Sequence, residues 1–252
     1  MLKRHAPVWV YVGGLALTGV AGWVNAVAVA SAYHAVTHMT GTVHAVSLEF
    51  SRGNSEVALR AAAVVLFFFL GATLSGVIIR QPTLHAGQRY GVALMVEGGL
   101  LAGAWFGLRN GSVTGEVLSA IACGLQNALA TSYSGAVLRT THMTGVVTDL
   151  GINIGHWLAR QPVEWFRVRL HLVLLLGFVT GGALGSQAHG HLGPASLLVP
   201  ATFVFFIGAL YTAQRARQKQ EHRHPEGPID SAVPTSRPTA STPGPPGVER
   251  HE

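Results

Sequence analysis

The chain has 252 residues, of which 49% are hydrophobic and only 11% are Asp, Glu, Lys or Arg. Ordinary soluble domains carry about 25% charged residues, so this composition excludes a water-soluble globular protein of this length and favours an integral membrane protein. The net charge of +6 is spread without a basic patch interleaved with aromatic residues, which argues against binding to nucleic acid, and the single cysteine, Cys123, excludes a disulfide within the chain.

Six apolar runs are long enough to be membrane spans, because about 20 apolar residues cross the hydrocarbon core of a bilayer. The first run follows Lys3 and Arg4, so we expect the N-terminus to stay in the cytoplasm. It is also too long for the apolar core of a cleaved signal peptide, which has about 7–15 residues. The six runs are residues 8–33, 57–79, 90–108, 116–133, 170–188 and 195–213.

Two shorter segments of mixed polarity lie between these runs, at residues 37–51 and 140–159. Each contains the same tetrapeptide, His-Met-Thr-Gly (HMTG), at residues 38–41 and again at 142–145. A polar tetrapeptide that recurs beside long apolar runs suggests an internal duplication, which is best tested by looking for further matches in the same order.

The two HMTG motifs belong to a longer ordered series of matches. The matching pairs are Asn25 with Asn127 and Gly76 with Gly182, each with a two-residue gap relative to the motif, and the run 90–108 with the run 195–213. We therefore predict an all-α, polytopic integral membrane helical bundle built from two sequence-related halves, residues 1–110 and 111–214. Each half would contain three full spans and a shorter helix that starts at HMTG.

The composition changes sharply after the last apolar run. Residues 215–252 are rich in Arg, Gln, His, Pro, Ser and Thr and have almost no large apolar side chains. Such a segment cannot bury enough apolar surface to offset the entropy lost on ordering, so we expect a disordered tail. Arg215, Arg217 and Lys219 follow the last span and are expected to hold the C-terminus in the cytoplasm.

Four stretches resemble the DUF1275 family, also called the YoaK family, of bacterial membrane proteins. They are AGWVNA at 21–26, HMTG at 38–41, GLQNA at 124–128 and THMTG at 141–145. The resemblance covers residues 8–213 and implies a location in the bacterial inner membrane, but it implies no mechanism because the family has no established activity. Many relatives have Asp where this chain has Asn25, and Asn where it has Thr42.

The HMTG motifs allow two interpretations. Thr37 and Thr141 are predicted N-caps of the following helices, and Gly41 and Gly145 would let another helix or a ligand approach the backbone. In the first interpretation both helices start inside the membrane and face each other across the repeat axis, as the broken helices of many transporters do. In the second, both motifs are helix-turn-helix corners at the membrane surface.

The number of crossings depends on these same segments. If the HMTG helices do not cross the membrane, each half has three spans and the repeats are inverted; if they cross, each half has four spans and the repeats run parallel. Residues 37–51 would form a helix of about 22 Å, which is short for a crossing. We expect six full spans plus two partial or interfacial helices, with both termini in the cytoplasm.

Polar residues at the HMTG motifs and inside the spans are the candidate substrate-binding residues. A carboxylate in a span is costly, so Glu97 suggests proton coupling or ion binding, unless it reaches the interface or pairs with a loop Arg. Asn25 and Asn127 suit hydrogen bonds between helices or contact with a substrate. The candidates are Asn25, His38, Thr40, Gly41, Glu97, Asn127, His142, Thr144, Gly145 and Asp149.

Catalytic, metal and cofactor sites are not predicted. The pair His34 and His38 has helical spacing but lacks a third ligand, and no phosphate loop, nucleophile elbow or suitable carboxylate pair is present. We therefore expect a protein that is not an enzyme.

Two functions remain open. The first is a transporter of a small solute or ion with a site at the interface of the repeats. The second is a non-transporting membrane scaffold or partner-binding protein. The expected partners are the lipid bilayer and an unknown small solute or ion. A second copy of the chain is also a possible partner, mainly for the scaffold function, since several glycines are spaced for helix packing.

Overall fold

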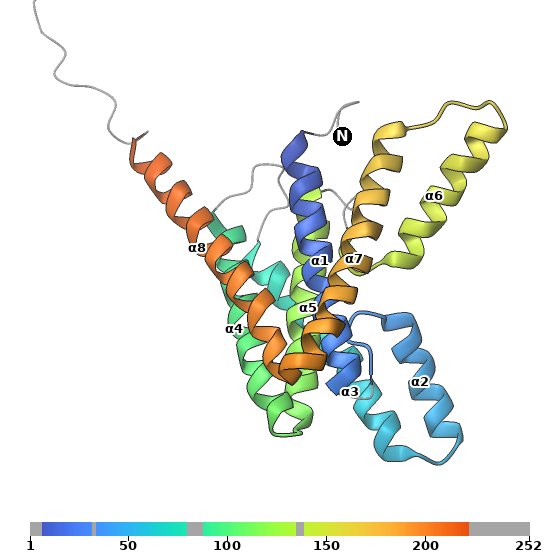
Figure 1. The fold of residues 1–252 in the computed structure, drawn as a ribbon, viewed down its shortest axis with the longest axis vertical. Helices are drawn as coiled ribbons and strands as arrows, with labels where there is room; N and C mark the ends of the chain where they lie inside the picture. Colours follow the sequence, from blue (N-terminus) through green and yellow to red (C-terminus); the bar gives the residue numbers. More distant parts are fainter. Residues whose placement is uncertain (1–6, 32–33, 80–87, 135–138, 222–252) are drawn as a thin grey trace, which may run out of the picture.

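The computed structural model describes residues 7–31, 34–79, 88–134 and 139–221, and the regular secondary structure of these residues is entirely helical (Figure 1). The fold class predicted from composition, an all-α protein, is therefore confirmed. The elements are α1 (Val8–Ser31), α2 (Met39–Ser51), α3 (Ser55–Ile78), α4 (Gln88–Arg109), α5 (Val113–Ser134), α6 (Met143–Leu158), α7 (Trp165–Leu192), the short 3₁₀ helix η1 (Gly193–Leu197) and α8 (Leu198–Glu221).

Four helical stretches of the described chain are long and apolar enough to cross a membrane. Three are α1, α3 and α4 from Arg89 onwards, and the fourth, Trp165–Gln218, contains α7, η1 and α8. Since that stretch changes direction at η1, it contains two of the expected spans (Figure 1). The expected span at residues 116–133 forms α5, which is not among these four stretches.

Helix α5 is the most enclosed of the long helices, which explains its polarity. Glu116, Ser119 and Gln126 are all buried in it. The side-chain amide of Gln126 donates to the carbonyl of Leu17 on α1 at 2.8 Å, and the hydroxyl of Ser119 donates to the carbonyl of Gly115 at 2.9 Å. Because protein rather than lipid surrounds α5, its polar side chains can be satisfied inside the bundle.

The long helices pack at glycines. Helix α1 lies against α7, and α5 lies against α3. A Cβ atom at Gly22 of α1 would collide with the carbonyl of Phe178 on α7, and a Cβ atom at Gly124 of α5 would collide with the carbonyl of Phe68 on α3. Small residues at such crossings let two backbones approach closely, and the resulting van der Waals packing favours helix association in lipid.

The two short helices run in opposite directions from the middle of the molecule (Figure 1). Helix α2 packs on α3 and ends at the lower end of the view, whereas α6 packs on α7 and ends at the upper end. The start of α1 and the end of α8 both lie at the upper end. Neither short helix extends across the bundle.

A polar turn closes the α2–α3 hairpin. Gly53 adopts a φ of +79°, which favours glycine. The carboxylate of Glu49 accepts hydrogen bonds from Asn54 at 2.7 Å and from Arg52 at 2.9 Å. The hydrogen bond from Asn54, and to a lesser extent that from Arg52, lowers the pKa of Glu49. The Glu49 carboxylate in this turn therefore stays ionised to lower pH than a free glutamate would.

Helix α8 continues to Glu221, so the first residues of the segment expected as a tail are helical. Residues 222–252, which make up most of that segment, lie outside the described part of the chain.

Candidate functional site

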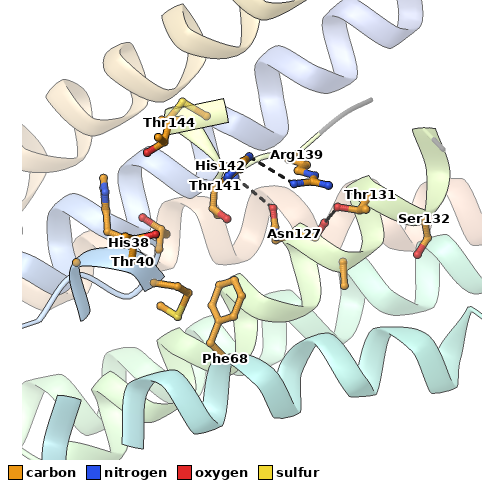
Figure 2. Close-up of a pocket in the computed structure, with 15 residues that line it drawn as sticks. His38, Thr40, Phe68, Asn127, Thr131, Ser132, Arg139, Thr141, His142 and Thr144 are labelled. Atoms are coloured by element: carbon orange, nitrogen blue, oxygen red, sulfur yellow. Dashed lines mark hydrogen bonds between the residues drawn. The ribbon is translucent and has the colours of Figure 1, made fainter. Parts of the chain in front are cut away.

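Both HMTG motifs border one cavity of about 720 Å³ (Figure 2). The cavity lies where the starts of α2 and α6 meet the C-terminal half of α5, with Phe68 of α3 on its far side. We call it the central cavity. The residues that line it are Thr37, His38, Met39, Thr40, Gly41, Phe68, Asn127, Ala128, Thr131, Ser132, Arg139, Thr141, His142, Met143 and Thr144.

Each HMTG motif starts a helix at its methionine. His38 and His142 occupy the N-cap positions, and neither side chain caps the first turn. The prediction that Thr37 and Thr141 are the N-caps is therefore wrong by one residue. Because no side chain caps the first turn of α2 or α6, their leading backbone N–H groups remain available to a ligand in the cavity.

An asparagine of the preceding long helix fixes the backbone just before each motif. The Oδ1 atom of Asn25 accepts hydrogen bonds from the hydroxyl of Thr37 at 2.8 Å and from its backbone N–H at 3.3 Å. The Oδ1 atom of Asn127 accepts one from the backbone N–H of Thr141 at 3.4 Å. These bonds explain why Thr37 does not cap α2, since its hydroxyl is used on Asn25.

Replacing Asn25 by leucine should destabilise the protein by about 1–3 kcal/mol, because the partly buried hydroxyl and N–H of Thr37 would lose their acceptor. The loss can be measured as the free energy of unfolding in detergent micelles. Asn25→Asp supplies the same acceptor atom and should be less harmful. Equal stability of Asn25→Leu and the unmodified chain would show that the anchor is unimportant.

The charged groups around the central cavity are positive. The guanidinium of Arg139 lies with its Nη1 atom 3.5 Å from Nδ1 of His142, and the imidazole of His38 lies across the cavity at the start of α2 (Figure 2). No aspartate or glutamate is among the described residues that line the cavity. The starts of α2 and α6 add the partial positive charge of two helix N-termini.

The structure brings six of the predicted site residues to this cavity and places four outside its lining. Asn25 lies behind the first motif, and Gly145 lies under the His142 ring, which a Cβ atom at residue 145 would strike. Glu97 is fully buried in α4 close to Cys123, with one carboxyl oxygen unpartnered. Asp149, on α6, lies 3.7 Å from Nε2 of His171 on α7. The six at the cavity are His38, Thr40, Gly41, Asn127, His142 and Thr144.

A family model described as "Protein of unknown function (DUF1275)" matches residues 13–210. The chain belongs to the DUF1275 family. The matched region contains every residue of the central cavity, both short helices and all but the ends of the bundle. No curated protein and no solved structure matches the chain significantly.

Sequence reasoning missed Arg139 as a site residue of this DUF1275 protein. The only available signal was its place three residues before His142, where the first motif has Ala35. It also missed Phe68, whose apolar run gives no sign that one member borders a polar cavity.

A second buried polar contact lies outside the cavity. Nδ1 of His34 is 3.0 Å from Oε1 of Glu116, and both side chains are buried. His34 lies in the connection between α1 and the first HMTG motif, and Glu116 lies at the start of α5, so the pair links these two segments.

Replacing His34 by leucine should lower the free energy of unfolding by about 3–5 kcal/mol, since Glu116 would be left buried without its partner. The double variant His34→Leu, Glu116→Leu removes both polar groups and should regain much of that loss. The comparison requires unfolding curves of both variants in one detergent. A double variant no more stable than His34→Leu alone would contradict this account.

Proposed function

We propose that this chain is a membrane transporter of a small anion, with its binding site in the central cavity. The observation that supports this most directly is that both HMTG helix starts and Arg139 line one cavity, at the level where α2 and α6 begin between the two ends of the molecule (Figure 1). No catalytic step, metal or cofactor is part of the proposal.

The chemistry of the lining favours an anion over a cation or a neutral solute. The backbone N–H groups at the two uncapped helix starts can donate hydrogen bonds to a negatively charged ligand. Helix starts of this kind bind anionic groups in many transporters. Arg139 adds a fixed positive charge that can bind a carboxylate or phosphate through two parallel hydrogen bonds. The hydroxyls of Thr40, Thr144 and Ser132 can complete the shell as neutral donors.

The arrangement of the helices supports inverted halves, which suit alternating access. Helix α1 of the first half packs on α7 of the second, and α5 of the second packs on α3 of the first. Gly22 and Gly124, each three residues before the anchoring asparagine, make these two contacts in the same way. The short helices α2 and α6 then run to opposite ends of the molecule (Figure 1).

Basic residues support a cytoplasmic location for both termini in a bacterial inner membrane. The turn between α6 and α7 and the last part of α8 lie at the same end of the molecule as the start of α1 (Figure 1). These segments and the first turns of α7 carry Arg160, Arg167, Arg169, Arg215 and Arg217, whereas the opposite end carries Arg52 after α2, Arg60 near the start of α3 and Arg109 at the end of α4. An excess of Arg and Lys marks the cytoplasmic side.

The proposal can be tested on the purified full chain with sodium salts of chloride, nitrate, phosphate and succinate. At equal ionic strength, at least one anion should raise the melting temperature, and a pulse of that anion should produce a current in proteoliposomes on a solid-supported membrane. Arg139→Ala should lose both effects, and Arg109→Ala, which changes an exposed arginine outside the cavity, should keep both. If none of the four anions stabilises the chain or carries current, the scaffold function becomes the better account.

A further inference from the structure

A second hollow, which we call the apolar groove, lies between α1, α4, α5 and α8 and has a volume of about 440 Å³. Its walls are nearly all apolar and include Val12, Gly13, Leu94, Phe203 and Ile207. The polar groups in its lining belong to Trp9, Tyr90, Thr140 and Tyr211. A polar solute would find few partners here, whereas a hydrocarbon chain would gain contact with apolar side chains on four helices.

The groove is open because α1 and α8 diverge towards the end of the molecule where α1 begins and α8 ends (Figure 1). A Cβ atom at Gly13 would meet nothing within 4 Å. Gly115 lies the same number of residues before Asn127 as Gly13 lies before Asn25, yet a Cβ atom there would collide with Leu108 and Ala104 of α4. Helix α4 packs closely on α5 at Gly115, but no helix packs in the same way on α1 at Gly13 among the described residues.

The mouth of the groove has aromatic and basic residues. The guanidinium of Arg215 lies 5.4 Å from the centre of the Tyr211 ring, and Tyr211 lines the groove. Arg89, which is exposed, directly precedes Tyr90 at the start of α4, the helix that packs on α8. Tyrosine and tryptophan prefer the level of the lipid headgroups, and basic residues beside them attract anionic lipids.

We propose that the apolar groove binds one anionic phospholipid, with an acyl chain between α1 and α8 and the phosphate at Arg215. The groove has exposed apolar side chains in its lining, such as Val12 and Phe203, and lies below a basic mouth, which matches the order of groups along a phospholipid. Charge selects the lipid class: a phosphatidylglycerol headgroup is attracted to Arg215 and Arg89, whereas the choline group of phosphatidylcholine offsets the charge of its own phosphate.

The bound lipid would also touch the segment that holds the cavity's arginine. Thr140 lines the groove, and its neighbours Arg139 and Thr141 line the central cavity. The hydroxyl of Thr140 is fully buried and has no hydrogen-bond partner among the described residues. One short stretch of chain thus separates the two hollows.

Native mass spectrometry of the full chain in detergent tests the proposal, with phosphatidylglycerol and phosphatidylcholine of identical acyl chains as probes. The unmodified chain should bind phosphatidylglycerol roughly fivefold more tightly, as expected for one basic residue near the headgroup. Gly13→Leu should fill the groove and lose this binding. Gly99→Leu is the matched control, because it adds the same side chain to open space on α4 outside the groove. Arg215→Gln should reduce this preference, because of the two arginines Arg89 alone then attracts the headgroup.

Three outcomes would overturn the proposal. The first is equal binding of the two lipids by the unmodified chain. The second is phosphatidylglycerol binding by Gly13→Leu at the level of Gly99→Leu. The third is a change in oligomeric state in Gly13→Leu with lipid binding intact, because a second copy of the chain would then be the occupant of the groove.

Discussion

Replacing Arg139 by alanine is expected to weaken anion binding in the central cavity by roughly tenfold to a hundredfold. A hydrogen bond to a charged group contributes about 1.5–3 kcal/mol, and every 1.4 kcal/mol corresponds to about a factor of ten in affinity. The guanidinium of Arg139 is the permanent positive charge among the described lining residues, so no neighbour replaces it. The measurement is a titration with the anion that stabilises the unmodified chain most strongly among chloride, nitrate, phosphate and succinate.

The conservative variant separates charge from geometry. Arg139→Lys keeps the positive charge but loses the planar pair of donors, so its affinity should lie between those of alanine and arginine if the ligand is a carboxylate or phosphate. Arg109→Ala should bind as the unmodified chain does. Unchanged affinity in a folded Arg139→Ala protein would remove the central cavity as an anion site.

Replacing Gly124 by alanine is expected to destabilise the bundle, by about 1–3 kcal/mol, although alanine is the better helix former. The added Cβ atom would collide with the carbonyl, C and Cα atoms of Phe68, which are backbone atoms that cannot rotate away. Helices α3 and α5 would have to separate, and the loss extends along their whole contact. Unfolding in micelles with increasing dodecyl sulfate measures the effect.

Gly76→Ala provides the control with the opposite sign. Gly76 lies on the same helix as Phe68, and a Cβ atom there meets nothing within 4 Å. Alanine at this position should therefore leave the protein unchanged or stabilise it, because it reduces the entropy cost of forming the helix. If Gly76→Ala and Gly124→Ala had equal effects, close packing at the α3–α5 crossing would not explain the glycine.

Several features of this DUF1275 protein could be predicted from the sequence because they depend on local composition and order. So few charged residues cannot cover the surface of a water-soluble protein of this length, so the composition predicts a helical membrane protein. The bounds of α1, α3 and α4 could be predicted to within a few residues, since apolar length sets the span. The HMTG motifs could be identified as helix starts because Thr and Gly have strong positional preferences there, even though His rather than Thr occupies the N-cap.

The tertiary structure decided which of the polar residues meet. His38 and His142 border one cavity because α1 packs on α7 and α5 on α3, and no local pattern predicts which helices will pair across the chain. Arg139 enters that cavity, whereas Glu97 is enclosed between helices away from it, although the sequence marked Glu97 and not Arg139 as exceptional. The polarity of α5 has the same cause: its surroundings are protein rather than lipid, and burial by other helices is a property of the assembled bundle alone.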